Sequence, residues 1–395
     1  MTSETDFDEL IDRQESDCIK WHYYDKDVIP MWVADMDFRS PEPVIAALRR
    51  RVDHGVFGYP ELGTRNTDLM KELTQTLVER LAERYDWSVE PEDIVLMPGV
   101  VTGFNLACHA LAVPDGEVFV QTPVYHPILH AAKETGCLGR QMELTGSPDG
   151  AYEVDYDLFA ASLTPQTRLF LLCNPHNPVG KVFRKDELLR MAEICLQRGV
   201  TICSDEIHCD LLYRGQQHFP IAALDPEIAR HTITLMSPSK TFNLAGLQCS
   251  FAIIPDRELR ERYVHSRKGL VSWVNLMGLQ AGLAAYQEGA EWLAQLLAYL
   301  EANRDFLVDY VRANLPGIKI GVPQGTYLAW LDCREAGIAG SPCQFFIEKA
   351  RVGFNDGEIF GPGGKGFVRM NFGTTRALLA KALQRMETAL NRNRA

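Results

Sequence analysis

The interpretation of this chain starts from one stretch of its sequence, Ser237-Pro238-Ser239-Lys240-Thr241-Phe242-Asn243-Leu244-Ala245-Gly246-Leu247. The stretch directly follows an apolar, β-branched run over residues 232–236, which predicts a buried strand. A lysine just past such a strand, among small hydroxyl residues, is poorly placed to be a solvated charge. Burial would favour its neutral amine, the form that captures an aldehyde covalently. The alternative is that Lys240 is an ordinary surface lysine on a loop.

Composition narrows the class of protein. The chain has 395 residues, enough for a large domain and a smaller one, and its apolar content of 46% can build a sizeable core. The formal net charge of −12 argues against a nucleic-acid partner, which needs a basic stripe. The sequence lacks the apolar run of about eighteen residues that a membrane span needs, and its acidic start is unlike a signal peptide. Its ten cysteines are scattered and form no Cys-x-x-Cys pair, so we expect a reducing, cytoplasmic location.

From residue 94 onward the sequence alternates short apolar runs with helical patterns. The predicted strands cover residues 94–97, 117–121, 140–144, 167–173, 200–204, 232–236 and 249–254. The predicted helices cover residues 44–52, 66–85, 100–112, 125–134 and 185–198. Continuous apolar strands that alternate with helices imply a mostly parallel sheet covered on both faces.

The last third of the chain predicts a second, smaller unit. Residues 274–314 have helical spacing, with expected breaks near Gly278, Gly282 and Gly289. Strands over 326–331 and 366–372 and helices over 343–352 and 375–391 follow. We therefore expect an N-terminal arm over residues 1–45 that joins the small domain, a large domain over 46–283 and a small α/β domain over 284–395.

The chemically unusual residues follow the ends of the predicted strands. They are Gly99 to Thr102, Tyr125, Asn174, Asp205, Ser237 and Lys240. In an open parallel sheet, ligands bind outside the carboxyl ends of the strands, so these residues should meet at one edge. The backbone N–H groups that follow Gly99 could cradle a phosphate at a helix start, with hydroxyls from Ser237 and Ser239, although an ordinary helix cap is the alternative.

Three further residues suggest what the rest of the ligand is. Asp205 ends a buried strand and needs a partner, which a protonated pyridine nitrogen or a structural cation could supply. Asn174 could donate to a phenolic oxygen and Tyr125 could lie flat on a ring, although a turn residue and a core aromatic are equally ordinary roles. Together with Lys240, these groups describe a site for pyridoxal 5′-phosphate (PLP).

These segments resemble, over nearly the whole chain, the fold-type I PLP-dependent enzymes of the class I and II aminotransferase superfamily. The resemblance rests on Asn174-Pro175-x-Asn177-Pro178-x-Gly180, Asp205-Glu206, Ser237-x-Ser239-Lys240 and Arg369. Within the superfamily the chain is similar to the cystathionine β-lyase, or C–S β-lyase, branch. This narrower similarity rests on Trp32-Val33-Ala34-Asp35-Met36-Asp37-Phe38, Ser204-Asp205-Glu206-Ile207-His208 and the stretch from Ser239 to Gln248.

The resemblance implies a seven-stranded, mostly parallel sheet in the large domain and a role for each matched residue. Lys240 would bind the cofactor aldehyde and act as the catalytic base, Asp205 would pair with the ring nitrogen, and Tyr125 would stack on the ring. The other cofactor contacts would come from Asn174, His208, Ser237, Ser239 and the backbone of Val100 and Val101. The substrate carboxylate would be bound by Arg369, Asn174 and the backbone of Ala34 and Asp35. Tyr59 would reach the cofactor phosphate of a second subunit, which implies a homodimer.

Two positions depart from the aminotransferase pattern. Many aminotransferases of this superfamily carry an arginine eight residues after the lysine and a tyrosine three residues after the aspartate, whereas this chain has Gln248 and His208. Both substitutions look like the lyase branch. We expect no metal, because ligands in His208-Cys209-Asp210 would alternate faces along a strand.

The sequence therefore predicts a PLP-dependent C–S β-lyase that cleaves cystathionine or a related cysteine S-conjugate by α,β-elimination to a thiol, pyruvate and ammonia. One alternative is an aminotransferase, which shares the removal of the α-proton; the absence of an evident second arginine argues mildly against dicarboxylate substrates. A second alternative, from another class, is a PLP-binding regulatory protein without turnover.

Overall fold

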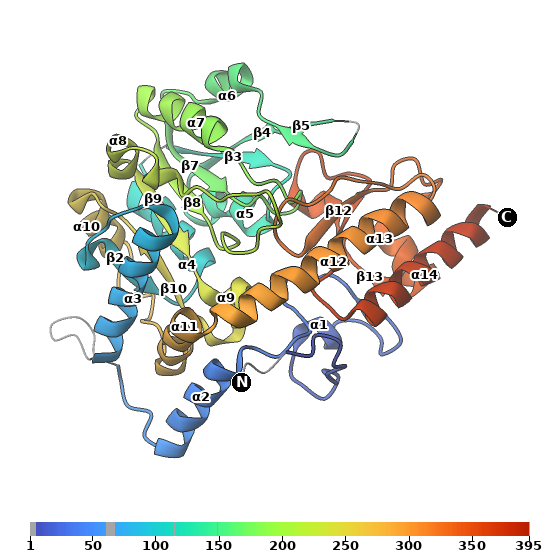
Figure 1. The fold of residues 1–395 in the computed structure, drawn as a ribbon. Coiled ribbons are helices and arrows are strands. Elements are labelled where there is room, and N and C mark those ends of the chain that lie inside the picture. The colour runs from blue at the N-terminus through green and yellow to red at the C-terminus, as the bar shows by residue number, and fades with distance from the viewer. Residues whose placement is uncertain (1–4, 61–67, 114, 148, 395) are drawn as a thin grey trace.

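Two β-sheets organise the molecule in the computed structural model, which describes residues 5–60, 68–113, 115–147 and 149–394. In Figure 1 the larger sheet and its helices fill the left of the view, and the smaller sheet lies to the right. The long helix α12 (Ala290–Asn314) runs from one to the other. The predicted combination of a large and a small α/β unit is therefore present, while the boundaries at residues 45 and 283 stay a prediction.

The larger sheet has seven strands in the order β2-β10-β9-β8-β7-β3-β4. They are β2 (Ile94–Met97), β3 (Glu117–Thr122), β4 (Leu138–Glu143), β7 (Thr167–Cys173), β8 (Thr201–Asp205), β9 (Thr232–Met236) and β10 (Ser250–Ile253). Neighbouring strands are parallel except at β10, which is antiparallel to β2 and β9. The predicted seven-stranded, mostly parallel sheet is confirmed.

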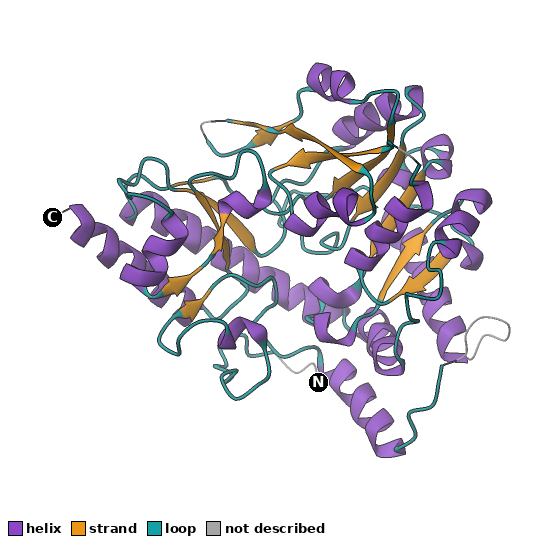
Figure 2. Cartoon of the chain, turned by 180° about the vertical axis from the view of Figure 1, so that it is seen from behind, coloured by secondary structure: helices purple, strands orange, loops and turns teal. Residues whose placement is uncertain are grey.

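Helices cover both faces of this sheet, as Figure 2 shows from behind. One face packs against α4 (Val100–Leu111), α5 (His126–Glu134) and α10 (Arg257–His265), and the other against α6 (Tyr156–Ser162), α7 (Lys185–Gln197) and α8 (Pro226–Arg230). Leu169 and Leu171 of β7 belong to the first apolar layer, and Phe170 and Leu172 belong to the second. Successive residues of a strand point to opposite faces, which explains why the strand sequences are apolar throughout.

The smaller sheet has four antiparallel strands in the order β11-β12-β15-β14. They are β11 (Lys319–Ile320), β12 (Leu328–Asp332), β14 (Asn355–Asp356) and β15 (Phe367–Asn371). The largest apolar cluster joins this sheet to α12, α13 (Pro342–Phe345) and α14 (Arg376–Arg394).

The N-terminal segment lies across both units. Its short strand β1 (Ile29–Pro30) pairs in parallel with β13 (Val352–Gly353) beside the smaller sheet. The remaining elements are α1 (Ile19–His22), α2 (Glu42–His54), α3 (Asp68–Tyr85), α9 (Pro238–Thr241), α11 (Leu276–Glu288), and the hairpin of β5 (Thr145–Gly146) and β6 (Tyr152–Glu153). The start of the helix expected from residue 66 lies outside the described residues.

Two of the three glycine breaks expected in residues 274–314 are wrong. Only Gly289 separates two helices, α11 and α12. Gly278 and Gly282 lie inside α11. A Cβ atom at Gly278 would clash with the Leu247 carbonyl oxygen, and one at Gly282 would stand 3.0 Å from Cys249 Sγ. These two glycines permit close packing against the segment after Lys240 and do not end the helix.

Two predicted elements of the smaller unit are shorter than expected. The helix expected over residues 343–352 ends at Ala350, because Arg351 adopts a left-handed φ of 55° and Val352 enters strand β13. The strand expected from residue 326 begins at Leu328, because Thr326 has a φ of 67°. Both residues leave the regular geometry that their neighbours require.

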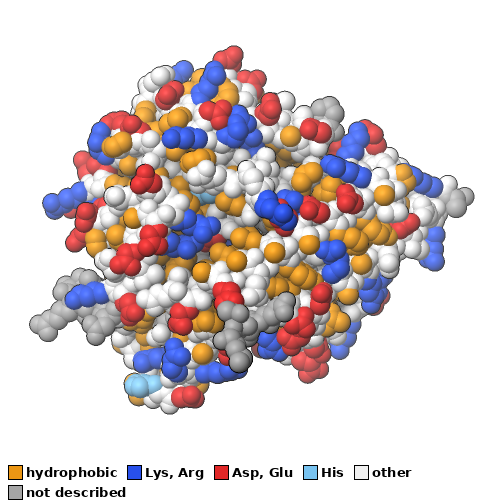
Figure 3. Space-filling view, viewed as in Figure 1, with side chains coloured by type: hydrophobic (Ala, Val, Ile, Leu, Met, Phe, Trp, Pro, Cys, Tyr) orange, Lys and Arg blue, Asp and Glu red, His pale blue; other side chains and the backbone are white. Residues whose placement is uncertain are grey.

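Helix length and surface charge bear on whether the protein contacts a membrane or a nucleic acid. Within the described residues, no helix is long and apolar enough to cross a membrane. On the face in Figure 3, basic and acidic side chains are interspersed, and its coloured residues show no continuous basic stripe.

Candidate active site

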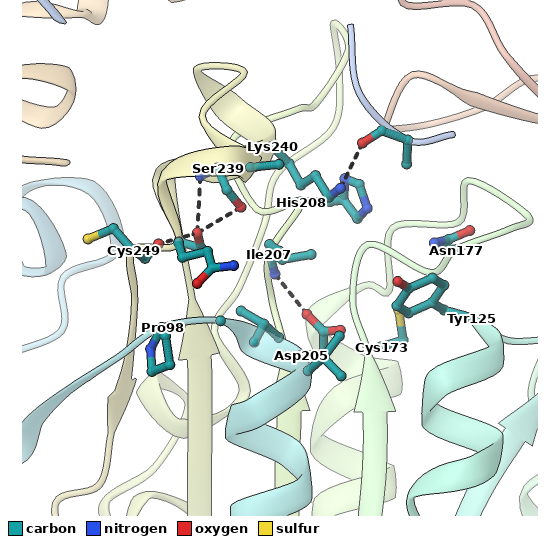
Figure 4. Close-up of a pocket in the computed structure, with 17 residues that line it drawn as sticks. Pro98, Tyr125, Cys173, Asn177, Asp205, Ile207, His208, Ser239, Lys240 and Cys249 are labelled. Atoms are coloured by element: carbon teal, nitrogen blue, oxygen red, sulfur yellow. Dashed lines mark hydrogen bonds between the residues drawn. The ribbon is translucent and has the colours of Figure 1, made fainter. Parts of the chain in front are cut away.

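A cavity of about 170 Å³ lies at the carboxyl ends of the central strands (Figure 4). Its lining consists of Ala34, Pro98, Gly99, Val100, Val101, Tyr125, Cys173, Asn177, Asp205, Ile207, His208, Ser237, Ser239, Lys240, Ala245, Gln248 and Cys249. The cavity therefore brings together most of the residues that the sequence assigned to a ligand site.

Lys240 lies on α9, immediately after strand β9, and its side chain crosses the top of the cavity in Figure 4. Its Nζ donates a hydrogen bond of 2.7 Å to the carbonyl oxygen of Ala34. The pKa of this amine is lowered to about 8, chiefly by burial and in part by Arg369, against the opposing effect of Asp35 and Asp205. The lowered pKa increases the share of Lys240 that is the neutral amine near pH 7, the form that reacts with a carbonyl group.

Asp205 ends strand β8 at the bottom of the cavity. Its Oδ1 accepts a hydrogen bond of 3.1 Å from the backbone N–H of Ile207. Burial raises the pKa of Asp205 to about 7. Among the described residues no basic side chain forms an ion pair with it, so a cationic ligand group would restore its charge.

The first turn of α4 forms one wall. Gly99 precedes the helix, and no described side chain caps the N–H groups of Val100 and Val101, which have no partner within a helix. Ser237 Oγ lies 2.8 Å from Ser239 Oγ on the opposite side. Gln248, also in the lining, is neutral, so this end of the cavity offers a helix start and hydroxyls to an anion.

Two buried polar atoms around the cavity lack a protein partner within the described residues. Asn174 Oδ1 accepts from the Phe183 backbone N–H at 3.2 Å, which leaves Nδ2 without an acceptor. His208 Nδ1 is also unpaired, and burial lowers the pKa of its ring to about 3, so the imidazole is neutral. Buried polar groups are normally paired, so both atoms suit contacts with a polar ligand.

Tyr125 precedes α5 and its backbone N–H donates to the Asn177 carbonyl oxygen at 3.0 Å. Its ring forms part of the cavity wall beside Cys173. Burial raises the pKa of its hydroxyl, so the phenol is neutral at physiological pH.

Arg369 lies on β15 of the smaller sheet and is only 4% exposed. Its guanidinium donates to Asn177 Oδ1 at 2.9 Å, to the Trp32 carbonyl oxygen at 2.9 Å and to Asn355 Oδ1 at 2.6 Å. All three acceptors are neutral, and Nε has no acceptor within the described residues. Burial lowers the pKa of Arg369 to about 10, and no carboxylate of the described residues pairs with it, so its guanidinium could bind an incoming carboxylate.

The segment around Ala34 closes the cavity from the N-terminal side. The carboxylate of Asp35 pairs with Arg13 at 2.9 Å and lies 3.6 Å from the buried Lys20, so its side chain is occupied and only its backbone remains for a ligand. Asn243 binds the backbone of Met36 from the larger unit, through Oδ1 at 3.0 Å and Nδ2 at 2.9 Å.

Tyr59 lies outside the cavity in the single chain. It stands in the extended segment after α2 and is 97% exposed. Its predicted contact with the phosphate of a second subunit stays a prediction.

The sequence reasoning missed two residues that take part in this arrangement. Asn177, which bonds Arg369, was visible in the Asn-Pro-x-Asn-Pro-x-Gly motif but was given no role. Tyr327, whose hydroxyl donates to the Ala34 carbonyl oxygen at 2.8 Å, was assigned to a strand. A strand pattern cannot reveal that the backbone turns at Thr326.

Comparison with known proteins now identifies the family. The model for "Aminotransferase class I and II" matches residues 26–386. The chain belongs to this family. The resemblance predicted from the sequence motifs is confirmed.

Three relatives show where the chain lies within the family. It is 39% identical to "Cystathionine beta-lyase PatB" of Bacillus subtilis, over 98% of this chain and all of the relative. Its fold matches cystalysin of Treponema denticola, which contains a PLP cofactor, with a TM-score of 0.93 at 33% identity, over 99% of this chain and all of the other. The PLP-bound C–S lyase of Staphylococcus hominis matches with a TM-score of 0.91 at 32% identity, over 98% of both chains.

Proposed function

We propose that this protein is a PLP-dependent C–S β-lyase that cleaves cystathionine or a related cysteine S-conjugate to a thiol, pyruvate and ammonia. The observation that carries the proposal is the cavity that joins the amine of Lys240, the carboxylate of Asp205 and the first turn of α4, the last two without a charged partner or a side-chain cap from the described residues. Relatives with lyase names at 32–39% identity over nearly the full length favour the lyase reaction.

The residues present fit the cofactor. The first turn of α4, with the hydroxyls of Ser237 and Ser239, would hold the phosphate. Asp205 would pair with the protonated pyridine nitrogen and gain the partner that it lacks within the described chain, and Nδ2 of Asn174 would donate to the phenolic oxygen. When bound, PLP supplies a cationic ring that accepts the electron pair left by removal of a proton from the substrate α-carbon.

The side chains of this protein bind the amino acid and move its protons. Arg369 would bind the substrate α-carboxylate in a two-point contact, as the neutral surroundings of its guanidinium allow. The neutral amine of Lys240 would take the α-proton, because its lowered pKa of about 8 leaves it competent as a base near neutral pH. His208 is neutral and would not add a charge beside this amine.

Two features separate the proposed lyase from an aminotransferase of the same family. Both reactions require the α-proton to be removed, and they diverge in whether the β-substituent leaves or a proton returns to the cofactor. Gln248 and His208 occupy the positions at which many aminotransferases carry arginine and tyrosine, and this departure favours the lyase branch. Aminotransfer remains the second candidate because the family includes it.

The functional unit that we propose is a cytoplasmic homodimer. An exposed apolar series lies at the end of α2 and just beyond it, made of Val52, Val56, Phe57 and Tyr59. An exposed tyrosine at the tip of such a series is suited to a partner subunit, where it would reach the second cofactor phosphate.

One incubation tests the reaction. The purified protein is mixed with L-cystathionine, and free thiol, pyruvate and keto-acid-dependent amino transfer are measured in parallel. Thiol and pyruvate in equal amounts support the lyase, whereas amino transfer without thiol supports an aminotransferase. A colourless protein that gives neither product with added PLP would contradict the proposal.

A further inference from the structure

Two side chains donate hydrogen bonds to one backbone oxygen at the mouth of the cavity. The carbonyl oxygen of Ala34 accepts from Lys240 Nζ at 2.7 Å and from the hydroxyl of Tyr327 at 2.8 Å. Tyr327 is 1% exposed and belongs to the smaller unit, whereas Lys240 belongs to the larger one. The dashed line from Lys240 in Figure 4 marks the first of these bonds.

The backbone before Tyr327 is held in an unusual conformation that places this ring. Thr326 has a φ of 67°, which a β-branched residue rarely adopts, and its N–H donates to the Leu211 carbonyl oxygen at 2.8 Å. Its Oγ1 accepts from the backbone N–H of Leu328 at 3.1 Å, and its carbonyl oxygen accepts from the Tyr213 hydroxyl. Conformations of this kind persist where the surrounding structure enforces them, often at functional sites.

The Ala34 carbonyl itself cannot turn away easily. On either side of it, Asn371 Nδ2 donates to the carbonyl oxygens of Val33 and Asp35, the second at 2.6 Å. The backbone N–H of Met36 donates to Asn243 Oδ1. The oxygen shared by Lys240 and Tyr327 is therefore a fixed point between the two sheets.

We propose that the Ala34 carbonyl is the binding position of the Lys240 amine whenever that amine is free, and that Tyr327 is a positioning residue that limits how strongly this oxygen holds it. A carbonyl oxygen has two lone pairs. With the Tyr327 hydroxyl on one of them, less electron density remains for the amine on the other. The hydroxyl thus disfavours the ammonium form, which is the stronger donor, and favours the neutral base.

Other charged groups also act on Lys240, and a change at Tyr327 alone leaves them in place. Asp205 and Asp35 favour its ammonium form, from strand β8 and from the N-terminal segment, and Arg369 on β15 opposes it. His208, which follows β8, is neutral. Tyr327 is neutral too, because burial raises the pKa of its hydroxyl far above the physiological range.

The test measures the amine directly and does not require turnover. Full-length protein free of PLP is treated with limiting acetic anhydride at a series of pH values, and acetylation of Lys240 is followed by mass spectrometry in wild type and Tyr327→Phe. We expect the Lys240 profile to move to higher pH by about half to one unit, so that acetylation at pH 7 slows by about 3- to 10-fold. The catalytic meaning of this shift rests on the proposed function, but a protein that never cleaves cystathionine would still show it.

Tyr213→Phe is the matched control, because it removes a buried hydroxyl that bonds the same turn without reaching Ala34. It should leave the Lys240 profile within about 0.2 pH units of wild type. A profile that is unchanged in Tyr327→Phe, or shifted equally in both variants, overturns the proposal.

A second variant tests the proposal if Tyr327→Phe folds poorly. Site-specific 3-fluorotyrosine at position 327 keeps the ring shape and makes the hydroxyl a stronger donor. It should move the Lys240 profile to lower pH, in the opposite direction. A shift to higher pH, or none, would overturn the proposal.

Discussion

Nη1 of Arg369 donates a hydrogen bond of 2.9 Å to Oδ1 of Asn177, which joins strand β15 of the smaller sheet to the turn after β7 of the larger one. The guanidinium is buried and, among the described residues, has neutral acceptors alone. If the α-carboxylate binds here, as we propose, it would pair with a buried positive charge that these neutral acceptors leave uncompensated.

Asn177→Asp should close this site with an internal carboxylate. An aspartate here would pair with Arg369 and compete with the substrate carboxylate, so KM should rise about 10- to 100-fold while kcat changes less. Steady-state kinetics with L-cystathionine measures both. Asn177→Ala, which removes the hydrogen bond without adding charge, should raise KM less. An unchanged KM in Asn177→Asp would show that substrate binds elsewhere.

Replacement of Lys240 should abolish covalent binding of PLP and most of the turnover. Lys240→Ala should give no borohydride-stable adduct by mass spectrometry, and the elimination rate should fall by at least about 10³-fold, because the base is lost. Lys185→Ala, a change at the exposed start of α7, serves as control and should retain both properties. An adduct that persists in Lys240→Ala would place the reactive amine at another lysine.

Asp205 should destabilise the PLP-free protein as pH rises. The pKa of Asp205 is raised by burial to about 7, so between about pH 4 and 7 the native state holds a proton that the unfolded state has lost. Stability therefore falls as pH rises through this window. Asp205→Asn should remove the loss and raise the free energy of unfolding at pH 8 by about 2–4 kcal/mol, at the expense of activity with PLP.

Urea unfolding of the PLP-free protein at pH 4.5 and pH 8 measures this effect. Asp210→Asn is the control of opposite sign, because Asp210 lies buried against Arg80 and accepts from Thr241 at 3.0 Å. Loss of that partner should destabilise the protein by about 3–5 kcal/mol. If Asp205→Asn were also destabilising at pH 8, Asp205 would have an internal cation as its partner.

Lys20 should be important for stability despite its distance in sequence from the site. Its side chain is fully buried, and Nζ lies 2.9 Å from Asp37 Oδ2. Lys20→Met should cost about 3–5 kcal/mol in the free energy of unfolding, because among the described residues it leaves the buried carboxylate of Asp37 with Arg13 alone as a cation. Chemical denaturation measures the loss, and Arg39→Ala, at an exposed ion pair with Glu9, should leave stability nearly unchanged. Equal effects in the two variants would contradict a structural role for the buried pair.

The sequence was sufficient for the larger sheet and for the residues at its edge. Apolar strands such as β7 and β8 can be recognised from local sequence. Because the strands are parallel, Asn174, Asp205 and Lys240 are then expected at one edge of the sheet, without any knowledge of tertiary contacts. Predicting the position of the site required only the ends of the strands, and these can be read from the local sequence pattern.

The remainder depended on contacts between distant segments. The left-handed turn at Thr326 is enforced by Leu211 and Tyr213, more than a hundred positions away, and no local pattern predicts it. In the same way, the local pattern predicts helix breaks at Gly278 and Gly282, whereas each glycine makes room for an atom of Leu247 or Cys249. Tertiary packing decided these positions against their local propensities.

The hydrogen bonds from Asn371 and Asn243 to the backbone of residues 33–36 also bear on how the protein can be truncated. A fragment that began at residue 46 would keep all strands of both sheets and the long helix that connects them, yet it would lose the carbonyl that the Lys240 amine binds. Truncation would therefore open the lysine to bulk water and also strip the apolar core of Ile29, Met31 and Met36. The N-terminal segment thus belongs to the cavity and to the stable core at once.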